Sequence, residues 1–189
     1  MKDEIIPVEI AEKVVALINR VTGKNVNIMG QGGVIIASVQ KERVGTVHEG
    51  AKRIMTGEID ELAVSEEEAS RFKGVKAGYN GVILRQGRRI GCIGISGNPE
   101  IVGPIQKMGA IIVQEELDKR SSDEERREEL DQIAQDITNL ADQIKVVAIN
   151  GSIQAARLGE RGAPVKVVVS QMAELTDRIN RMAVRIAGS

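Results

Sequence analysis

Apolar and polar residues follow a helical period first and then short strand-like runs in the N-terminal part of the chain. Between Val8 and Val21 apolar residues recur every three or four positions, which predicts a helix that begins after Pro7 and ends before Gly23. The short apolar segments NVNIM and VIIAS lie on either side of the glycine-rich segment 30–33. They predict two strands joined by a hairpin turn.

Two capping boxes follow these strands. The first is TVHE at residues 46–49, and the second is SEEE at residues 65–68. In this motif the hydroxyl at the first position accepts the amide hydrogen of the fourth residue, whose carboxylate reaches back to the first amide. We therefore expect one helix from the first box to about Gly57, and a shorter helix from the second box to Gly74.

Three further segments, VKAGYN, GVILRQ and RIGCIGIS, predict strands, with a turn at Gln86-Gly87-Arg88. A long helix is expected to start at Asn98-Pro99. This order of elements lacks a regular strand–helix–strand alternation, so it favours an antiparallel sheet flanked by helices. The predicted class of residues 1–118 is therefore α+β, with a PAS- or profilin-like sheet.

Residues 119–189 are dense in charged residues and helix formers, and their apolar residues recur in alternating steps of three and four. The outgoing series consists of Leu130, Ile133, Ile137, Leu140, Ile144, Val147 and Gly151, and the returning series of Val165, Val168, Met172, Leu175, Ile179, Met182 and Ile186. Such heptad spacing keeps one seam of a helix facing a partner helix. Matched end to end, the two series mirror each other about residue 158. We therefore predict an antiparallel helical hairpin, a coiled coil with its tip near residues 157–160.

A single two-helix hairpin with such narrow apolar stripes leaves much apolar surface in water. Two hairpins joined as a four-helix bundle would cover it, so we predict a homodimer. The pattern leaves open whether Lys119–Asp123 is continuous helix or a hinge.

Composition excludes several classes of protein. The 26 basic and 27 acidic residues nearly cancel, and Tyr79 and Phe72 are the only aromatic residues, which argues against a nucleic-acid partner. One cysteine and one histidine exclude a disulfide framework and a multi-cysteine or multi-histidine metal site, so we expect no metal and no cofactor. The apolar runs are too short to span a bilayer and the N-terminus has no signal-peptide core, so we expect a cytoplasmic protein without a membrane partner.

Three spaced motifs distinguish residues 8–118. They are RVG at 43–45 with HEGA at 48–51, GV at 74–75 followed by GYN at 78–80, and GCIGISGNP at 91–99. In these motifs the segment resembles the sugar-diacid recognition domain, the sensor module of carbohydrate-diacid regulators. The resemblance implies recognition of small hydroxylated mono- or dicarboxylates. Such regulators usually continue into a DNA-binding helix-turn-helix, and nothing in this sequence looks like one.

The segment around the predicted tip contains a second set of motif residues. They are Ala148, Asn150, Ile153, the run AAR at 155–157, Gly159-Glu160, Gly162 and VV at 167–168. In these residues the segment is similar to the cytoplasmic hairpin tip of methyl-accepting chemotaxis receptors, although Gln154 stands where that family usually has Glu. The resemblance implies a tip that contacts a histidine kinase or its coupling protein. The residues that would make this contact are Asn150, Gln154, Arg157, Glu160 and Arg161.

Candidate ligand-binding residues gather near the first predicted capping box. Arg43 lies just before the helix start, with His48 and Gly50 at its beginning, and a guanidinium beside free helix-N-terminal amides suits a carboxylate. The resemblance indicates the same place. Asn80 and Ser96, at strand ends, would form hydrogen bonds with the hydroxyl groups of the ligand. The alternative is purely structural: Arg43 pairs with a nearby Glu, and His48 caps or packs.

A catalytic role finds little support, and we expect no enzyme. His48 has Glu49 beside it, but no spacing assembles a catalytic triad, and Cys92 lies in an apolar strand as a core thiol. The glycine-rich segment 30–33 lacks the Lys-Ser/Thr of a phosphate loop, and the charged run 123–129 is typical of a solvated helix face.

The leading hypothesis is a cytosolic sensor that binds a small carboxylate and passes the change through the long helix into a dimeric coiled-coil hairpin. The alternative is a scaffolding protein whose hairpins assemble dimers and whose globular part is a degenerate sensor. An enzyme acting on a small hydroxyacid is the third and weakest hypothesis.

Overall fold

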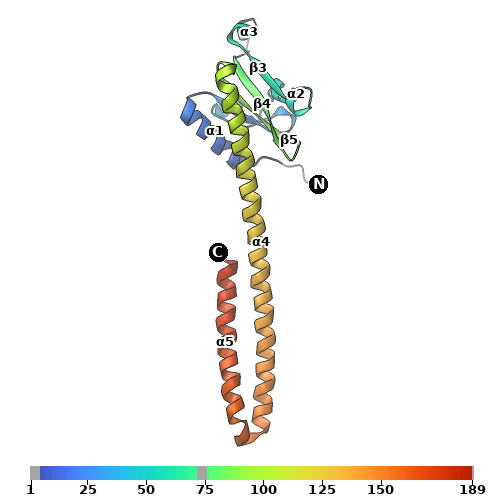
Figure 1. Ribbon diagram of the computed structural model, residues 1–189, viewed down its shortest axis with the longest axis vertical. Coiled ribbons are helices and arrows are strands. Elements are labelled where there is room, and N and C mark those ends of the chain that lie inside the picture. The colour runs from blue at the N-terminus through green and yellow to red at the C-terminus, as the bar shows by residue number, and fades with distance from the viewer. Residues whose placement is uncertain (1–4, 72–75, 189) are drawn as a thin grey trace. The chain divides into compact units, whose positions relative to one another are not determined.

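The computed structural model describes residues 5–71 and 76–188, which divide between Arg120 and Ser121 into two compact units. We call them the head and the helical unit. Figure 1 shows their elements: α1 (Val8–Thr22), β1 (Val26–Met29), β2 (Ile35–Ser38), α2 (Glu49–Met55), β3 (Glu61–Val64), α3 (Glu66–Ser70), β4 (Gly78–Arg85), β5 (Arg88–Ser96), α4 (Pro99–Arg157) and α5 (Ala163–Ala187), with 3-10 turns η1 (Gln31–Gly33), η2 (Lys41–Arg43) and η3 (Gly159–Gly162). Within the described residues, no helix combines the length and apolarity needed to cross a membrane.

The head contains one five-stranded sheet in the order β2-β1-β5-β4-β3, and each neighbouring pair is antiparallel. The predicted α+β class with an antiparallel sheet is therefore confirmed. Side chains of a strand alternate between its two faces. On the central strand β5, Ile93 and Ile95 belong to one core cluster, and Cys92 belongs to another cluster across the sheet.

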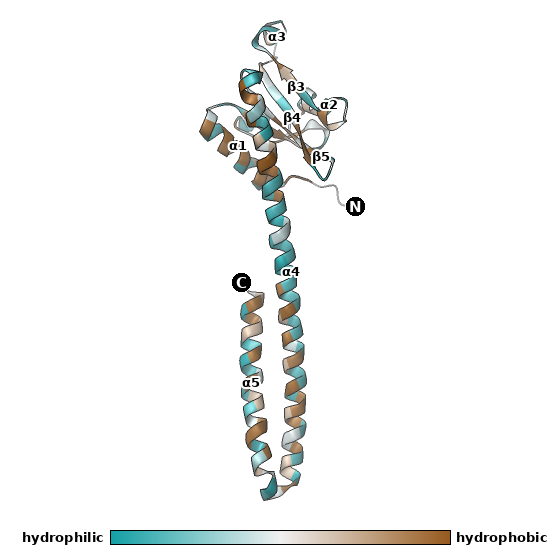
Figure 2. Ribbon diagram, viewed as in Figure 1, coloured by the Kyte–Doolittle hydropathy of each residue, from teal (hydrophilic) through white to brown (hydrophobic). Residues whose placement is uncertain are grey.

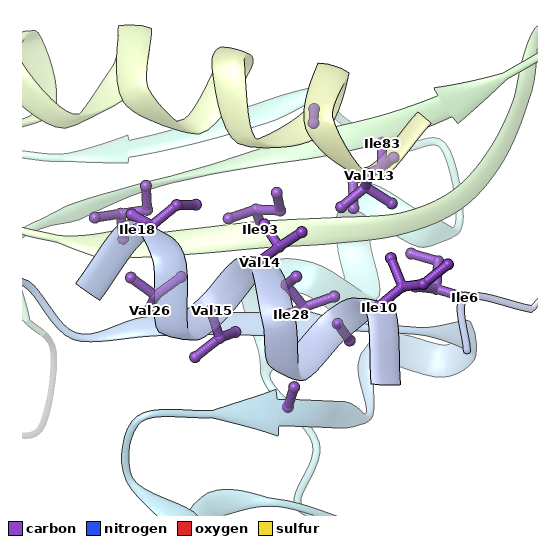
Figure 3. Packing of buried hydrophobic residues seen from close by; sticks show 14 of the residues in the cluster. Ile6, Ile10, Val14, Val15, Ile18, Val26, Ile28, Ile83, Ile93 and Val113 are labelled. Carbon is purple, nitrogen blue, oxygen red and sulfur yellow. The ribbon is translucent and has the colours of Figure 1, made fainter. Parts of the chain in front are cut away.

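The larger core lies on the sheet face that α1 and the first part of α4 cover. Figure 3 shows Val14 and Ile18 of α1 beside Ile93 of β5 and Ile28 of β1, all of them buried. The capping residue of α1 is Gly23, whose positive φ of 66° ends the helix where the sequence predicted. The opposite face of the sheet is covered by α2, whose Ala51 and Ile54 pack on Met29 and Cys92.

A buried polar contact fastens α4 to the sheet. The carboxamide of Gln106, 2% exposed, donates from Nε2 to the carbonyl oxygen of Gly81 on β4 at 2.8 Å. A Cβ at Gly81 would lie only 2.5 Å from Gln106 Oε1, so the strand needs a glycine there. A second close approach is at Gly109, where a Cβ would lie 2.8 Å from Ile18 Cδ1.

Three parts of the predicted order of strands and helices were wrong. The segments GYN and GVILR form one strand, β4, because Gly81 marks the approach of Gln106 rather than a break. The prediction missed β3, a four-residue edge strand with no buried side chain, which is defined by its pairing with β4. The capping box at Ser65 is confirmed, but its helix ends at Ser70, and the expected end at Gly74 lies outside the described residues.

The helical unit consists of the later part of α4, the turn η3 and α5, and Lys119–Asp123 lies within unbroken helix. Its buried residues recur every seven positions: Ala134, Ala141, Ala148 and Ala155 on α4, Gly162 at the end of η3, and Val169, Thr176 and Ala183 on α5. The two arms run antiparallel (Figure 1), and these buried small residues form the seam between them. A Cβ at Gly151 would lie 2.9 Å from Val169 Cγ2, and one at Gly162 would lie 2.0 Å from the Ala155 oxygen.

The bulky apolar series was wrongly predicted to form the seam between these two arms. Leu140 is 58% exposed and Leu175 is 52% exposed, whereas Ile137 and Ile144 are half-buried beside the seam. The alanines allow the two helix axes to approach closely, since interaxial distance depends on the side chains at the contact. The large side chains of the predicted series therefore lie to one side of the seam.

The turn between β1 and β2 offers a matched test of the head's packing. Gly32 (φ +63°) has open space where a Cβ would be, but a Cβ at Gly33 (φ +74°) would lie 2.5 Å from the backbone nitrogen of Lys52. We expect Gly33→Ala to lower the free energy of unfolding by about 3 kcal/mol or more, because left-handed strain and overpacking add. Gly32→Ala, with strain alone, should cost about 1 kcal/mol. Urea unfolding followed by the fluorescence of Tyr79, the only tyrosine and a core residue of the head, measures both, and equal effects would contradict the packing described.

Candidate functional site

Two adjoining cavities open on the face of the sheet that carries α2. The larger, about 540 Å³, is lined by Gln40, Arg43, Val47, His48, Glu49, Gly50, Leu62, Val64, Lys76 and Asn80. The smaller, about 70 Å³, is lined by Asn25, Asn27, Gln40, Arg43, His48, Lys76, Ala77, Gly78, Asn80, Gly94, Ile95 and Ser96. The structure thus brings together all five residues predicted for the ligand site: Arg43, His48 and Asn80 line both cavities, Gly50 the larger and Ser96 the smaller.

The floor of the site is a row of residues in register across three strands. Asn27 of β1 and Asn80 of β4 both pair with Gly94 of the central strand β5. Residues paired in this way lie on one face of the sheet. Because Gly94 has no side chain, the Asn80 carboxamide extends over it: a Cβ at Gly94 would lie 2.3 Å from Asn80 Oδ1. Two carboxamide side chains therefore belong to this row, one on each side of Gly94.

The Asn27 carboxamide is held in place by a buried hydroxyl. Ser38 Oγ donates to Asn27 Oδ1 at 2.7 Å and accepts the amide hydrogen of Gln40 at 2.9 Å. Both Asn27 and Ser38 are buried. Since the oxygen of Asn27 is already bonded, its NH₂ group is the part that remains for the cavity.

Arg43 is a cation without a carboxylate partner among the described residues, so the predicted structural alternative of an Arg43–Glu pair is not observed. Its neighbour in η2, Lys41, has Glu12 at 2.7 Å. The Thr46 hydroxyl donates to the carbonyl oxygen of Arg43 at 2.7 Å, which fixes the end of this turn. The guanidinium is thus available to an anion in the cavity.

His48, and not Thr46, caps α2, so the predicted capping box at 46–49 was wrong. Nδ1 of His48 accepts the amide hydrogen of Ala51 at 3.2 Å. An imidazole that accepts at Nδ1 carries its proton on Nε2, which leaves an N–H donor on the other side of the ring. The cap also occupies one of the helix amides that the sequence analysis had assigned to the ligand.

Gly50 leaves space for the imidazole ring of His48. A Cβ at this position would lie 2.7 Å from Leu62 Cδ2 and 3.3 Å from His48 Cε1. The role of Gly50 in the site is therefore steric. Because it has no side chain, Leu62 of the edge strand β3 and the His48 ring can both approach this position.

Burial lowers the pKa of His48 below its usual value of 6.5, and the charge of Arg43 lowers it further. The neutral ring is also the form that can accept the Ala51 hydrogen bond. Burial and capping therefore favour the same protonation state.

Among the lining residues that sequence reasoning missed are the polar residues Lys76, Gln40 and Asn27. Lys76 adds a second cation near Arg43. Asn27 sits at an alternate position of a strand whose other residues are apolar, and that polar interruption was the available signal. Nothing in the local sequence of Lys76 or Gln40 marks them, because both lie outside the regular elements.

Ser96 lines the smaller cavity, and its side chain is bonded to the backbone there. Its hydroxyl accepts the amide hydrogen of Asn25 at 3.2 Å.

The predicted tip residues Asn150, Gln154, Arg157, Glu160 and Arg161 are all exposed, at the end of α4 and in η3. Among residues 5–71 and 76–188, no three His, Cys, Asp or Glu side chains are placed to hold a metal ion.

Comparison with known proteins gives a family and several partial relatives. The sequence profile of the family described as "Putative sugar diacid recognition" matches residues 6–140. The chain is 32% identical over 110 residues to "Uncharacterized protein YsfB" of Bacillus subtilis (strain 168), and 31% identical over 105 residues to "Carbohydrate diacid regulator" of Escherichia coli (strain K12). It is also 31% identical over 90 residues to "Putative sensory transducer protein YvaQ" of Bacillus subtilis (strain 168).

These matches cover 56%, 55% and 47% of this chain but only 30%, 26% and 16% of the respective relatives, so the chain spans less than a third of each. Among solved structures, it is similar to the cofactor-binding GAF domain of the nutrient sensor CodY from Clostridium difficile. That match has a TM-score of 0.41 and 15% identity, and it covers 56% of this chain and 83% of that one.

The lowered pKa of His48 predicts that the head loses stability in mild acid. The neutral ring is favoured in the folded state, so its contribution is complete above pH 6.5 and is lost as the pH falls toward the lowered folded-state pKa. Urea midpoints from Tyr79 fluorescence at pH 7.5 and 5.5 should show this loss. His48→Asn keeps a capping oxygen but removes the titration, so its midpoint should change less over the same range. Equal pH dependence in the two proteins would contradict the assignment.

Proposed function

Because the chain belongs to the family of sugar diacid recognition domains, we propose that its head is a sensor that binds a small hydroxylated mono- or dicarboxylate. One observation supports the proposal: Arg43, Lys76 and His48 line the same cavities as the row of strand residues Asn27, Gly94 and Asn80. Charged donors on the walls suit a carboxylate, and carboxamides on the floor suit hydroxyl groups.

The chemistry of each side chain indicates which part of the ligand it would bind. The Arg43 guanidinium offers paired N–H donors that match a carboxylate, and His48 adds a neutral donor. The NH₂ of Asn27 donates to a ligand oxygen, and the Asn80 carboxamide exchanges hydrogen bonds with hydroxyl groups. Lys76 stands near enough to the same cavities to neutralise a second carboxylate.

The site and α4 lie on opposite faces of the same strands, which gives the head a route for a response. Asn80 faces the cavity, and the next residue, Gly81, accepts the Gln106 hydrogen bond from α4. Ser96, at the end of β5, precedes the first residue of α4 by three positions. We propose that ligand binding biases the position of α4, which requires different affinities for two arrangements of the helix.

For the helical unit we propose a homodimer that receives this change. Heptad geometry places one set of bulky exposed residues from both antiparallel arms on the same side of the alanine seam. They are Ile133, Leu140 and Val147 on α4, and Val168, Leu175 and Met182 on α5, each between 43% and 59% exposed. Two such faces would bury each other in a four-helix bundle.

The exposed tip would then be the surface that meets a downstream partner. We propose a histidine kinase or its coupling protein, in contact with Asn150, Gln154, Arg157, Glu160 and Arg161. One relative's name contains the words sensory transducer and another's the word regulator, which supports a signalling output. A scaffolding role with a degenerate head is the alternative, and it is favoured if dimers form but no carboxylate binds. The cytoplasmic location stays a prediction.

Calorimetric titration with glycolate, glycerate, tartrate and sugar diacids tests the ligand proposal. We expect at least one to bind, and Arg43→Gln to weaken it by about ten- to a hundredfold, as the loss of charge-assisted hydrogen bonds requires. Lys41→Gln, in the same turn but paired with Glu12, is the matched control and should leave affinity unchanged. Folded, ligand-free protein that takes up none of these acids would overturn the proposal.

Sedimentation equilibrium tests the dimer of the helical unit. Leu140→Glu should raise the dimer dissociation constant by roughly a hundredfold or more, since two buried leucines of about 1.5–3 kcal/mol each are lost per dimer. Asn139→Glu adds the same charge at the neighbouring exposed position and should have little effect. A wild-type monomer, or equal responses of the two variants, would count against the four-helix bundle.

A further inference from the structure

The two cavities of the candidate site share a set of polar residues, and the larger cavity adds aliphatic side chains to it. The shared set consists of Gln40, Arg43, His48, Lys76 and Asn80. The described residues that line only the larger cavity are Val47, Glu49, Gly50, Leu62 and Val64. We call the three aliphatic residues of this second set, Val47, Leu62 and Val64, the apolar wall.

The register of the sheet places two residues of the apolar wall at one end of the site. Leu62 of the edge strand β3 pairs with Asn80 of β4, and Asn80 pairs with Gly94 of β5. Val64 lies two positions further along β3, on the same face of the sheet, and pairs with Gly78. The polar row that contains Asn80 therefore ends in aliphatic side chains on β3, and Figure 2 shows hydrophobic colouring along this strand.

A ligand in the larger cavity can reach the apolar wall. Val47 is 51% exposed, and Leu62 and Val64 are half-buried. Apolar surface that water still touches contributes to binding when a ligand covers it. The cavity volume of about 540 Å³ is typical of a pocket for a small organic molecule. The site can therefore bind an apolar group as well as an acidic one.

The charges of the site favour a ligand with one acidic end. The cations Arg43 and Lys76 both belong to the shared polar set. Among the described residues that line only the larger cavity, Glu49 is the charged one. Its carboxylate would repel a second acidic group placed beside the apolar wall. An aliphatic group therefore suits this end of the cavity better than a second carboxylate does.

We propose that the ligand is an α-hydroxy monocarboxylate with a short, branched aliphatic end, and that this end lies on the apolar wall. The inference rests on the proposed carboxylate-binding function and names the class of acid. Arg43 and Lys76 bind the carboxylate, and the carboxamide of Asn80 bonds to the hydroxyl group. Neighbouring strands lie about 4.8 Å apart, so a chain of only about three or four carbons reaches from Asn80 to Leu62.

Three acids that share one α-hydroxy acid group and differ at the far end test this inference. The far end is an isopropyl group in α-hydroxyisocaproate, a carboxylate of similar shape in malate, and an ammonium group in γ-amino-α-hydroxybutyrate. Each enantiomer is titrated separately into the full chain by calorimetry. We expect α-hydroxyisocaproate to bind at least about tenfold tighter than either of the other acids, since its isopropyl group gains what a buried valine side chain gains.

Isosteric variants locate the aliphatic end of the ligand. Val47→Thr and Val64→Thr keep the shape of the side chain but replace a methyl group by a hydroxyl group. Each should weaken the binding of α-hydroxyisocaproate by about three- to tenfold and change that of malate by less than about twofold. Val21→Thr makes the same change at the end of α1, where the side chain is 76% exposed and lines neither cavity, and should alter neither affinity.

The outcomes separate this inference from the proposed function. Malate or γ-amino-α-hydroxybutyrate that binds as tightly as α-hydroxyisocaproate, or tighter, overturns the inference. The carboxylate sensor then still stands if Arg43→Gln weakens the acid that binds. Equal effects of Val64→Thr and Val21→Thr on α-hydroxyisocaproate also overturn it, as does a chain that binds glycolate or a sugar diacid but none of the three acids. Folded, ligand-free protein that binds no carboxylate at all overturns both proposals.

Discussion

The two-residue alternation of the central strand β5 governs the rest of the head. Both faces of this strand are covered, so each residue belongs either to the core under α1 and α4 or to the face with α2 and the candidate site. Ile93 and Ile95 provide the first, and Cys92 and Gly94 belong to the second. A register slip by one residue would exchange the two sets. The core on one face and the polar floor on the other therefore depend on the same backbone register.

Missing side chains are what let the functional parts come close together. Gly94 leaves room for the Asn80 carboxamide, Gly81 for Gln106, and Gly50 for the His48 ring. The same principle recurs in the helical unit, where alanines and Gly162 allow α4 and α5 to approach closely. In both units small residues set the geometry, and the larger polar or apolar groups beside them are then free to face a ligand or a partner.

Protonation and capping cooperate at His48 in a way that ties the ligand site to local stability. The ring caps α2 through Nδ1, burial and the charge of Arg43 favour its neutral form, and His48 lines both cavities. An anion near Arg43 would oppose that lowering of the His48 pKa. Binding of the proposed carboxylate ligand would therefore be linked energetically to helix capping and to the protonation of this imidazole.

Local patterns were sufficient where neighbouring residues decide the structure. Gly23 ends α1 because its φ is positive, and the capping box at Ser65 caps α3 through two residues three positions apart. Gln86 and Gly87, both with positive φ, form the turn between β4 and β5. The motifs around Arg43, His48, Gly50, Asn80 and Ser96 also named residues that do line one pair of cavities. Here the sequence carries the information, since each feature depends on contacts within a few positions or on an ordered set of motifs.

Other features were decided only by residues distant in the chain. The edge strand β3 exists through its pairing with β4, and His48 displaced Thr46 as the cap of α2, where Gly50 lets Leu62 of β3 approach the ring. Lys76 and Asn27 joined the site because strands β1, β4 and β5 lie side by side in register. The heptad series correctly marked apolar helix faces. In the folded hairpin, however, alanines form the seam, because helix backbones approach most closely where the side chains are smallest.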